Sequence, residues 1–276
     1  MQVISKLFPG IALVFSFSTL HAQIDSVLHQ RDSVVQSQAD PTVLFFQQNE
    51  KISSPASVRL VTKTNKIVSL PDFLKSTGIY ADHVRADLDK DGKKELLISN
   101  YTGGAHCCDE IYIFKNIALN KYQYAVRFYA GSTTIMKNNE FIYNFYEQFG
   151  YFFTCYACVY TDTSDEAPIQ LHGIILTYNK GKMIVAPGDK ELRNSITDNL
   201  GKLGERPYQK LADDMAQDNG LRKEFAMNLA VFYYTFGRNL PETQNLFNKY
   251  YKYPDAKKVW VAFTKQLLVI KKDNDF

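Results

Sequence analysis

One stretch decides how the fold is interpreted: Asp87-Leu-Asp89-Lys-Asp91-Gly-Lys-Lys-Glu95, which runs directly into the apolar residues Leu96-Leu97-Ile98. Acidic side chains stand at positions 1, 3, 5 and 9, and a glycine stands at position 6, where the chain must turn sharply. This spacing gathers hard oxygen ligands around one point, which suits calcium. A helix-flanked calcium loop needs a bidentate Glu at position 12, but position 12 here is Ile98. The sequence therefore predicts a calcium loop that leads into a β-strand.

The pattern Asp-x-Asp-x-Asp-Gly-x-x-Glu-Leu, with a second strand after a Gly turn, resembles the FG-GAP/VCBS calcium repeat of propeller-type extracellular proteins. The resemblance covers residues 86–115 and one copy. It implies five calcium ligands: the side chains of Asp87, Asp89, Asp91 and Glu95, and the carbonyl of Lys93. Glu95 stands where the family usually has Asp. The run from Gly103 to Cys108 is also similar to one that a group of secreted bacterial proteins carries after such a loop, and it implies no activity.

The alternative is a solvated Asp-Gly turn in which Lys90, Lys93 and Lys94 offset the acids and no metal binds. Four carboxylates at alternate positions would repel one another without a cation. We therefore expect calcium.

The first residues read as a secretory signal peptide. Lys6 precedes an apolar run from Leu7 to Leu20, and Leu20-His21-Ala22 ends in a small residue before Gln23. The run is shorter than the roughly 20 apolar residues that span a bilayer. We expect cleavage after Ala22 and a periplasmic or secreted protein with no transmembrane segment in the mature chain.

Cleavage would leave 254 residues (276 minus 22), enough for one large or two modest domains. The removed segment carries one Lys and no acid, so the net charge would fall from +3 to +2. This near-neutral charge gives no electrostatic footprint for nucleic acid. The 18 Tyr and 19 Phe favour a sheet-rich core.

The hydrophobic pattern predicts an α+β fold. Residues 24–37 have helical spacing up to Pro41, residues 58–62 and 66–70 read as a hairpin, and a helical turn starts at Pro71. An antiparallel β-meander follows, as a partial propeller-like sheet or a sandwich, because about ten strands and one acidic loop are too few for a closed propeller. Its further strands are expected at 94–100, 110–115, 122–130, 132–137, 140–147, 150–160, 169–179 and 182–186.

An α-helical C-terminal domain is predicted after Pro187-Gly188. Leu221, Phe225, Leu229, Phe232 and Phe236 form one apolar stripe, and Val259, Trp260, Phe263, Leu267 and Ile270 form the last. Five lysines opposite that last stripe leave a membrane-surface helix as the alternative to helix packing. The expected domains are a signal peptide (1–22), an N-terminal helix and linker (23–56), a β-rich domain (57–187) and an α-helical domain (188–276).

The four cysteines are Cys107, Cys108, Cys155 and Cys158, and export favours two disulfides. We favour cross-links between the two clusters, because both members of each cluster would point to opposite faces of a strand. A bond between Cys155 and Cys158 is the alternative and would resemble a redox dithiol. A tetrahedral soft-metal site, with His106 as a further ligand, is a third reading.

Known catalytic patterns are absent: there is no Gly-x-Ser-x-Gly, no His-Glu-x-x-His, no phosphate loop and no dinucleotide fingerprint. The ten aromatic residues in 141–160 are expected to form a core face, with a glycan- or peptide-binding face as the alternative. We expect a non-enzymatic, calcium-binding, disulfide-bonded module that binds a protein or glycan partner at the cell envelope. The alternative is a periplasmic enzyme, either a thiol oxidoreductase that uses Cys155 and Cys158 or a hydrolase on the aromatic face.

Overall fold

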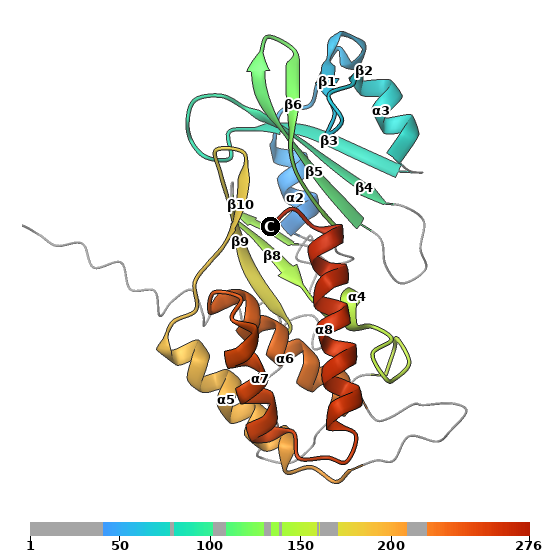
Figure 1. The fold of residues 1–276 in the computed structure, drawn as a ribbon. Helices are drawn as coiled ribbons and strands as arrows, with labels where there is room; N and C mark the ends of the chain where they lie inside the picture. Colours follow the sequence, from blue (N-terminus) through green and yellow to red (C-terminus); the bar gives the residue numbers. More distant parts are fainter. Residues whose placement is uncertain are drawn as a thin grey trace, which may run out of the picture. The chain divides into compact units, whose positions relative to one another are not determined.

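The computed structural model describes residues 41–77, 80–101, 109–129, 134–137, 140–158, 160, 171–208 and 220–276 (Figure 1). All described elements belong to a compact unit that spans residues 37–276. The fold is α+β, as the sequence predicts. The predicted signal peptide, the helix over 24–37 and the residues His106, Cys107 and Cys108 lie outside the described residues.

The first sheet has six strands in the order β2-β1-β6-β5-β4-β3. All neighbours are antiparallel except β1 and β6, which run parallel, so the predicted antiparallel meander contains one parallel pair. The strands are β1 (Arg59–Val61), β2 (Ile67–Ser69), β3 (Tyr80–Ala86), β4 (Glu95–Tyr101), β5 (Asp109–Ala118) and β6 (Lys121–Tyr129).

Strand β4 is covered on both faces, which explains its unbroken apolar run. Leu96 and Ile98 join one apolar cluster with Phe114 and Tyr122. Leu97 points to the opposite face and joins the larger cluster. Side chains along a strand alternate between faces, so Glu95, two residues before Leu97, shares the face of the larger cluster.

The second sheet has four antiparallel strands in the order β10-β9-β8-β7. A two-residue turn joins β9 to β10, with Lys180 at φ 50° and Gly181 at φ 87°. Two positive φ values are the signature of the tight hairpin turn that favours glycine. The strands are β7 (Thr134–Lys137), β8 (Glu140–Asn144), β9 (Gly173–Asn179) and β10 (Lys182–Val185).

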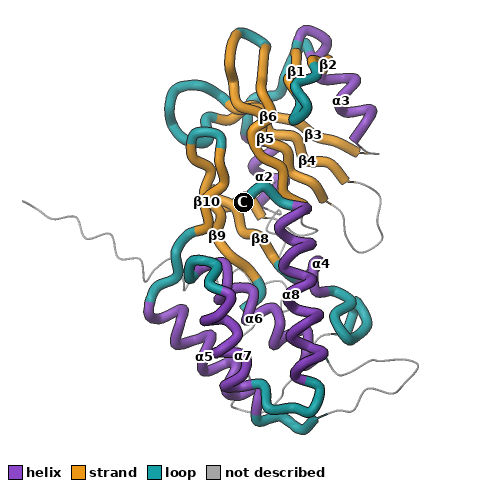
Figure 2. Tube along the Cα trace, in the orientation of Figure 1, coloured by secondary structure: helices purple, strands orange, loops and turns teal. Residues whose placement is uncertain are grey.

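Helices dominate the chain after β10 (Figure 2). The predicted stripes are buried as expected: Phe225 and Phe232 on α6, and Val259, Phe263 and Ile270 on α8. Packing of α8 on α6 and α7 accounts for its apolar face. The helices are α2 (Pro41–Gln48), the 3₁₀ turn η1 (Pro55–Ser57), α3 (Leu70–Thr77), α4 (Tyr146–Phe149), α5 (Lys190–Gly204), α6 (Leu221–Thr235), α7 (Leu240–Tyr250) and α8 (Ala256–Asp273).

The larger apolar cluster includes one face of the first sheet, the second sheet and helices α5 to α8. Phe141 and Tyr143 of β8 are fully buried in it, together with Phe145 and Phe149. The aromatic alternation over 141–145 is therefore a core face, as expected. The change from strands to helices falls at the predicted place, and both sides of Pro187-Gly188 contribute to the same cluster.

One predicted strand differs from the structure, and one observed strand was not predicted. Residues 150–158 form turns and bends rather than a strand, because the short helix α4 (Tyr146–Phe149) intervenes and no strand pairing follows it over these described residues. Pro41 is the first residue of α2, and the predicted helix over 24–37 that it was expected to follow lies outside the described residues. Strand β3 was not predicted. None of the described helices combines the length and the apolar character needed to cross a membrane.

Candidate metal centre

The acidic loop connects β3 to β4, and the two strands pair from Ala86 and Glu95 outward. Lys90 (φ 58°) and Gly92 (φ 85°) both take the left-handed conformation inside the loop. A glycine adopts this conformation without strain, which explains its place at position 6. The loop therefore makes two local reversals between the ends of one hairpin.

Asp87 organises the loop from its first position. Its Oδ1 accepts the backbone N–H of Asp91 at 3.1 Å, and its Oδ2 accepts that of Gly92 at 3.0 Å. Short acidic side chains commonly fold turns in this way, by replacing a backbone acceptor. Asp87 is half-buried. Each of its oxygens accepts one of these two hydrogen bonds, and the second lone pair of each oxygen could bind a cation.

Glu95 is fully buried at the first residue of β4. Its Oε2 accepts the backbone N–H of Leu88 at 3.1 Å, whereas its Oε1 is buried with no hydrogen-bond partner. Burial raises the pKa of Glu95 to about 7, the Leu88 amide opposes this, and the charges of Asp89 and Asp91 raise it further. A buried carboxylate oxygen without a donor is costly unless a proton or a cation satisfies it.

Asp89 ties the loop to the second sheet. Its Oδ2 accepts the backbone N–H of Lys180 at 2.8 Å, and Lys180 belongs to the β9–β10 turn. Its Oδ1 is buried without a partner, like Oε1 of Glu95. The loop and that turn, about 90 residues apart in sequence, therefore meet at a carboxylate.

Tyr178 of β9 adds a third polar group to this place. It is fully buried, and no hydrogen bond of normal geometry reaches its hydroxyl. Burial raises the pKa of Tyr178, and the charges of Glu95 and Asp89 raise it further, while the backbone of Gly181 acts in the opposite direction. The hydroxyl therefore lies within the electrostatic reach of both acids.

The structure brings Asp87, Asp89 and Glu95 together. One carboxylate oxygen of each lies within 4.8 Å of the others, and no other such group of acids, His or Cys occurs among the described residues. The nearby lysines do not neutralise the group. Lys94 pairs with Glu50 at 2.7 Å instead, and within the described chain Lys90 and Lys93 form no salt bridge with these acids.

Asp91 and Lys93 have different surroundings from the three gathered acids. Asp91 is exposed, and its Oδ1 accepts the backbone N–H of Lys93 at 2.8 Å. Neither residue belongs to the group of three, so the roles that the repeat resemblance gives them stay predictions. Tyr178 and the β9–β10 turn were missed, because nothing in the sequence signals that a distant hairpin lies beside the loop.

The cysteines depart from the favoured pairing. Cys155 and Cys158 are bonded to each other, with their Cα atoms 5.0 Å apart. A cross-link from this cluster to Cys107 or Cys108 is therefore wrong. The reason is the turn over 150–158, which places residues three apart on the same side rather than on opposite faces of a strand. The same bond removes this pair from any soft-metal site.

A buried histidine and the predicted aromatic face also have structural explanations. His172 is buried and contacts Glu224 at 2.6 Å, so it is a satisfied core histidine. The aromatic side chains at 141, 143, 145 and 149 are buried and cannot offer a glycan-binding face.

Comparisons with family models, curated proteins and solved structures gave no match.

Proposed function

We propose that this protein is an exported calcium-binding module, stabilised by a disulfide, that serves as a non-enzymatic binding or structural unit of the cell envelope. The observation that carries the proposal is the pair of buried oxygens without hydrogen-bond partners, Oδ1 of Asp89 and Oε1 of Glu95. Both residues belong to the group of three acids, in which one carboxylate oxygen each of Asp87, Asp89 and Glu95 lies within 4.8 Å of the others. An ion bound by this group would satisfy both oxygens at once.

The donor set favours calcium over other divalent ions. All candidate ligands are oxygens, which suit hard cations rather than zinc or copper. Calcium accepts six to eight oxygens in irregular geometry, whereas magnesium requires near-ideal octahedral geometry and keeps several waters. A loop that supplies carboxylates from the half-buried Asp87 and Asp89 and from the fully buried Glu95 fits the more permissive ion.

The proposed role of calcium is to stiffen the contact between the loop and the β9–β10 turn. Without a cation, Asp89 and Glu95 repel each other and Glu95 resists ionisation. A bound ion would remove both costs, and the bond from Lys180 to Asp89 would persist. Folding and binding are then coupled, since the folded protein alone presents the site.

Export is supported by the signal-like first segment and by the Cys155–Cys158 disulfide, which belongs to an oxidising compartment. Extracellular calcium modules work at millimolar calcium and bind weakly, with dissociation constants of roughly 10⁻⁴–10⁻³ M. We propose a protein or glycan at the cell envelope as the partner.

Thermal unfolding in calcium and in chelator tests the proposal. The chain should melt at a higher temperature in calcium, because a ligand bound only by the folded state stabilises it. Asp89→Ala should lose this shift. The matched control is Asp198→Ala, which removes an exposed acid from α5 and should keep the full shift. An Asp89→Ala protein with an unchanged calcium shift would end the proposal.

A further inference from the structure

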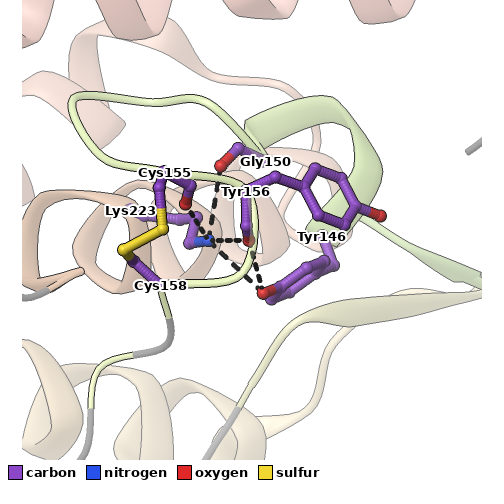
Figure 3. The surroundings of a disulfide bond; sticks show 6 residues. All are labelled: Tyr146, Gly150, Cys155, Tyr156, Cys158 and Lys223. Carbon is purple, nitrogen blue, oxygen red and sulfur yellow. Dashed lines mark hydrogen bonds between the residues drawn. A yellow bond between two sulfur atoms is a disulfide. The ribbon is translucent and has the colours of Figure 1, made fainter. Parts of the chain in front are cut away.

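The disulfide between Cys155 and Cys158 lies beside a buried lysine (Figure 3). Lys223 comes from α6 and is only 1% exposed. Its Nζ donates to the carbonyl of Tyr156 at 2.9 Å, of Gly150 at 3.3 Å and of Cys155 at 3.4 Å. The ammonium is therefore fixed against the backbone of the loop that carries both cysteines.

This loop is also held by contacts that do not involve sulfur. The hydroxyl of Tyr146 donates to the carbonyl of Tyr156 at 2.8 Å, and the Tyr156 hydroxyl bonds to Glu147. The Tyr156 ring packs on Gly150 so closely that a Cβ there would lie 2.5 Å from it. The disulfide closes a ring over a sequence separation of only three residues, and the entropic stabilisation from a cross-link grows with loop length.

The position of Lys223 bears on what happens when the bond opens. A cation near a cysteine lowers the pKa of its thiol, because it stabilises the thiolate. Nζ is 3.4 Å from the carbonyl oxygen of Cys155, so the ammonium is a buried positive charge on the backbone of the residue that would carry the thiolate, and charges interact strongly in a low-dielectric interior. Both cysteines are half-buried rather than fully enclosed.

We propose that Cys155 and Cys158 form a thiol–disulfide exchange site whose leaving thiolate, that of Cys155, is stabilised by Lys223. This inference is independent of the calcium site, and it gives the Cys155–Cys158 disulfide a redox role in place of the purely structural, non-enzymatic role proposed above. The co-reactant is a dithiol. One of its thiolates attacks Sγ of Cys158, the Cys155–Cys158 bond breaks, and its electron pair stays on Sγ of Cys155. A mixed disulfide with Cys158 results.

The second sulfur of the dithiol, as a thiolate, then attacks the first sulfur of the dithiol in the mixed disulfide. This breaks the bond to Cys158, and the released Cys158 thiolate takes a proton from water. The dithiol has lost two electrons and two protons and becomes a disulfide. Cys155 and Cys158 have gained two electrons: Cys158 has become a thiol, and the Cys155 thiolate becomes one when it takes the second proton from water. Lys223 acts as a positioning residue, since it does not itself touch the exchanging sulfur of the co-reactant.

Other charged groups surround the loop in the described structure and must be separated from Lys223. Glu147 contacts Tyr156, and Glu224 follows Lys223 on α6 and pairs with His172. Lys258 of α8 lies over the ring of Phe153 at 5.5 Å, on the protein surface. Lys258 therefore provides a matched control, a second lysine at the same loop that is not buried against its carbonyls.

The first measurement equilibrates the full chain with mixtures of reduced and oxidised glutathione at pH 7. Alkylation and peptide mass mapping then give the state of Cys155 and Cys158 separately from Cys107 and Cys108. We expect half-reduction within the accessible glutathione range, whereas a purely structural disulfide resists the glutathione pool. A pair that stays oxidised in every mixture would overturn the proposal.

The second measurement follows the pH dependence of alkylation by iodoacetamide in the reduced chain. The pKa of the Cys155 thiol should lie at least about one unit below the ordinary thiol pKa of about 8.5. Lys223→Met should remove this shift and change the exchange constant about tenfold, equivalent to about 30 mV. Lys223→Arg should restore the shift, and Lys258→Met should leave it unchanged. If Lys223→Met does not fold, the unmodified chain decides alone: both thiols titrating near 8.5 would overturn the proposal.

Discussion

Replacing Glu95 by Gln should make the metal-free protein more stable at alkaline pH and at the same time abolish its response to calcium. Glu95 is fully buried, and its pKa is raised from the ordinary 4.5 to about 7 by burial first and by neighbouring charge second. Gln keeps an acceptor for the Leu88 amide. Its amide group would also place a donor beside Asp89, since one carboxylate oxygen of each residue lies within 4.8 Å of the other. The substitution thus removes a charge that only a cation would compensate.

The raised pKa of Glu95 decides how its contribution to stability changes with pH. Because the folded pKa lies above the unfolded one, the protonated carboxyl contributes its full stability below pH 4.5, and this is lost as the pH rises through about 7. The difference of 2.5 pH units between 7 and 4.5, at about 1.4 kcal/mol each, gives a cost of about 3 kcal/mol at pH 8. At pH 5 the corresponding cost is below about 1 kcal/mol.

Urea unfolding at pH 5 and pH 8, in chelator and in calcium, measures these free energies of unfolding. In chelator, the free energy of unfolding of Glu95→Gln should exceed that of the parent chain by up to about 3 kcal/mol at pH 8 and by little at pH 5. In calcium, the free energy of unfolding of the parent chain at pH 8 should rise, and that of the variant should not. Glu205→Gln, an exposed acid beyond α5, is the control and should change little. A Glu95→Gln chain less stable than the parent at pH 8 in chelator would refute the reasoning.

Three further outcomes are expected. Gly204→Ala should destabilise the fold by about 1–3 kcal/mol, because its Cβ would lie 2.3 Å from the carbonyl oxygen of Tyr250. Gly201→Ala, one turn earlier in α5, meets nothing closer than 3.6 Å and should be neutral or stabilising by up to about 1 kcal/mol; thermal melts that rank the two variants otherwise would contradict this packing. Asp275→Asn should reduce the loss of stability at acid pH. Burial raises the pKa of Asp275, but hydrogen bonds, led by the one from Lys63, outweigh burial and lower the pKa below 3.8. The ionised Asp275 therefore stabilises the fold, and this stabilisation is lost as the pH falls below 3.8. An unchanged acid limb in a pH series of urea melts would count against this. Gly92→Ala should cost about 1 kcal/mol and weaken calcium binding, because the residue has φ 85° and its surroundings are open, so the strain is in the backbone alone; titration calorimetry with unaltered affinity would exclude a role for this turn.

Local sequence patterns predicted much of the secondary structure. The hairpin of β1 and β2, the strands β4 to β6 and the helices α6 and α8 follow from periodicity and turn residues within a few positions of one another. The strand predicted over 150–160 was wrong because its aromatic residues suit a strand, whereas the structure buries Phe152 from a turn that follows the short helix α4. Tertiary packing overrides β-propensity there.

The candidate site was only partly visible in the sequence. Spacing singled out Asp87, Asp89, Asp91 and Glu95, and the structure gathers Asp87, Asp89 and Glu95 of these. Tyr178 and the Lys180 amide reach the same place through the packing of a second sheet, which no local pattern encodes. The same holds for Lys223, whose approach to the Cys155 loop depends on how α6 packs.

The proposed calcium site is tested most directly by locating the ion in a crystal structure of the full chain grown in calcium. The account predicts one anomalous peak bounded by carboxylate oxygens of Asp87, Asp89 and Glu95, at calcium–oxygen distances of about 2.3–2.6 Å. It also predicts that Oδ1 of Asp89 and Oε1 of Glu95 both bind that ion. Calcium bound elsewhere, or a loop whose two buried oxygens are satisfied by the protein alone, would contradict it.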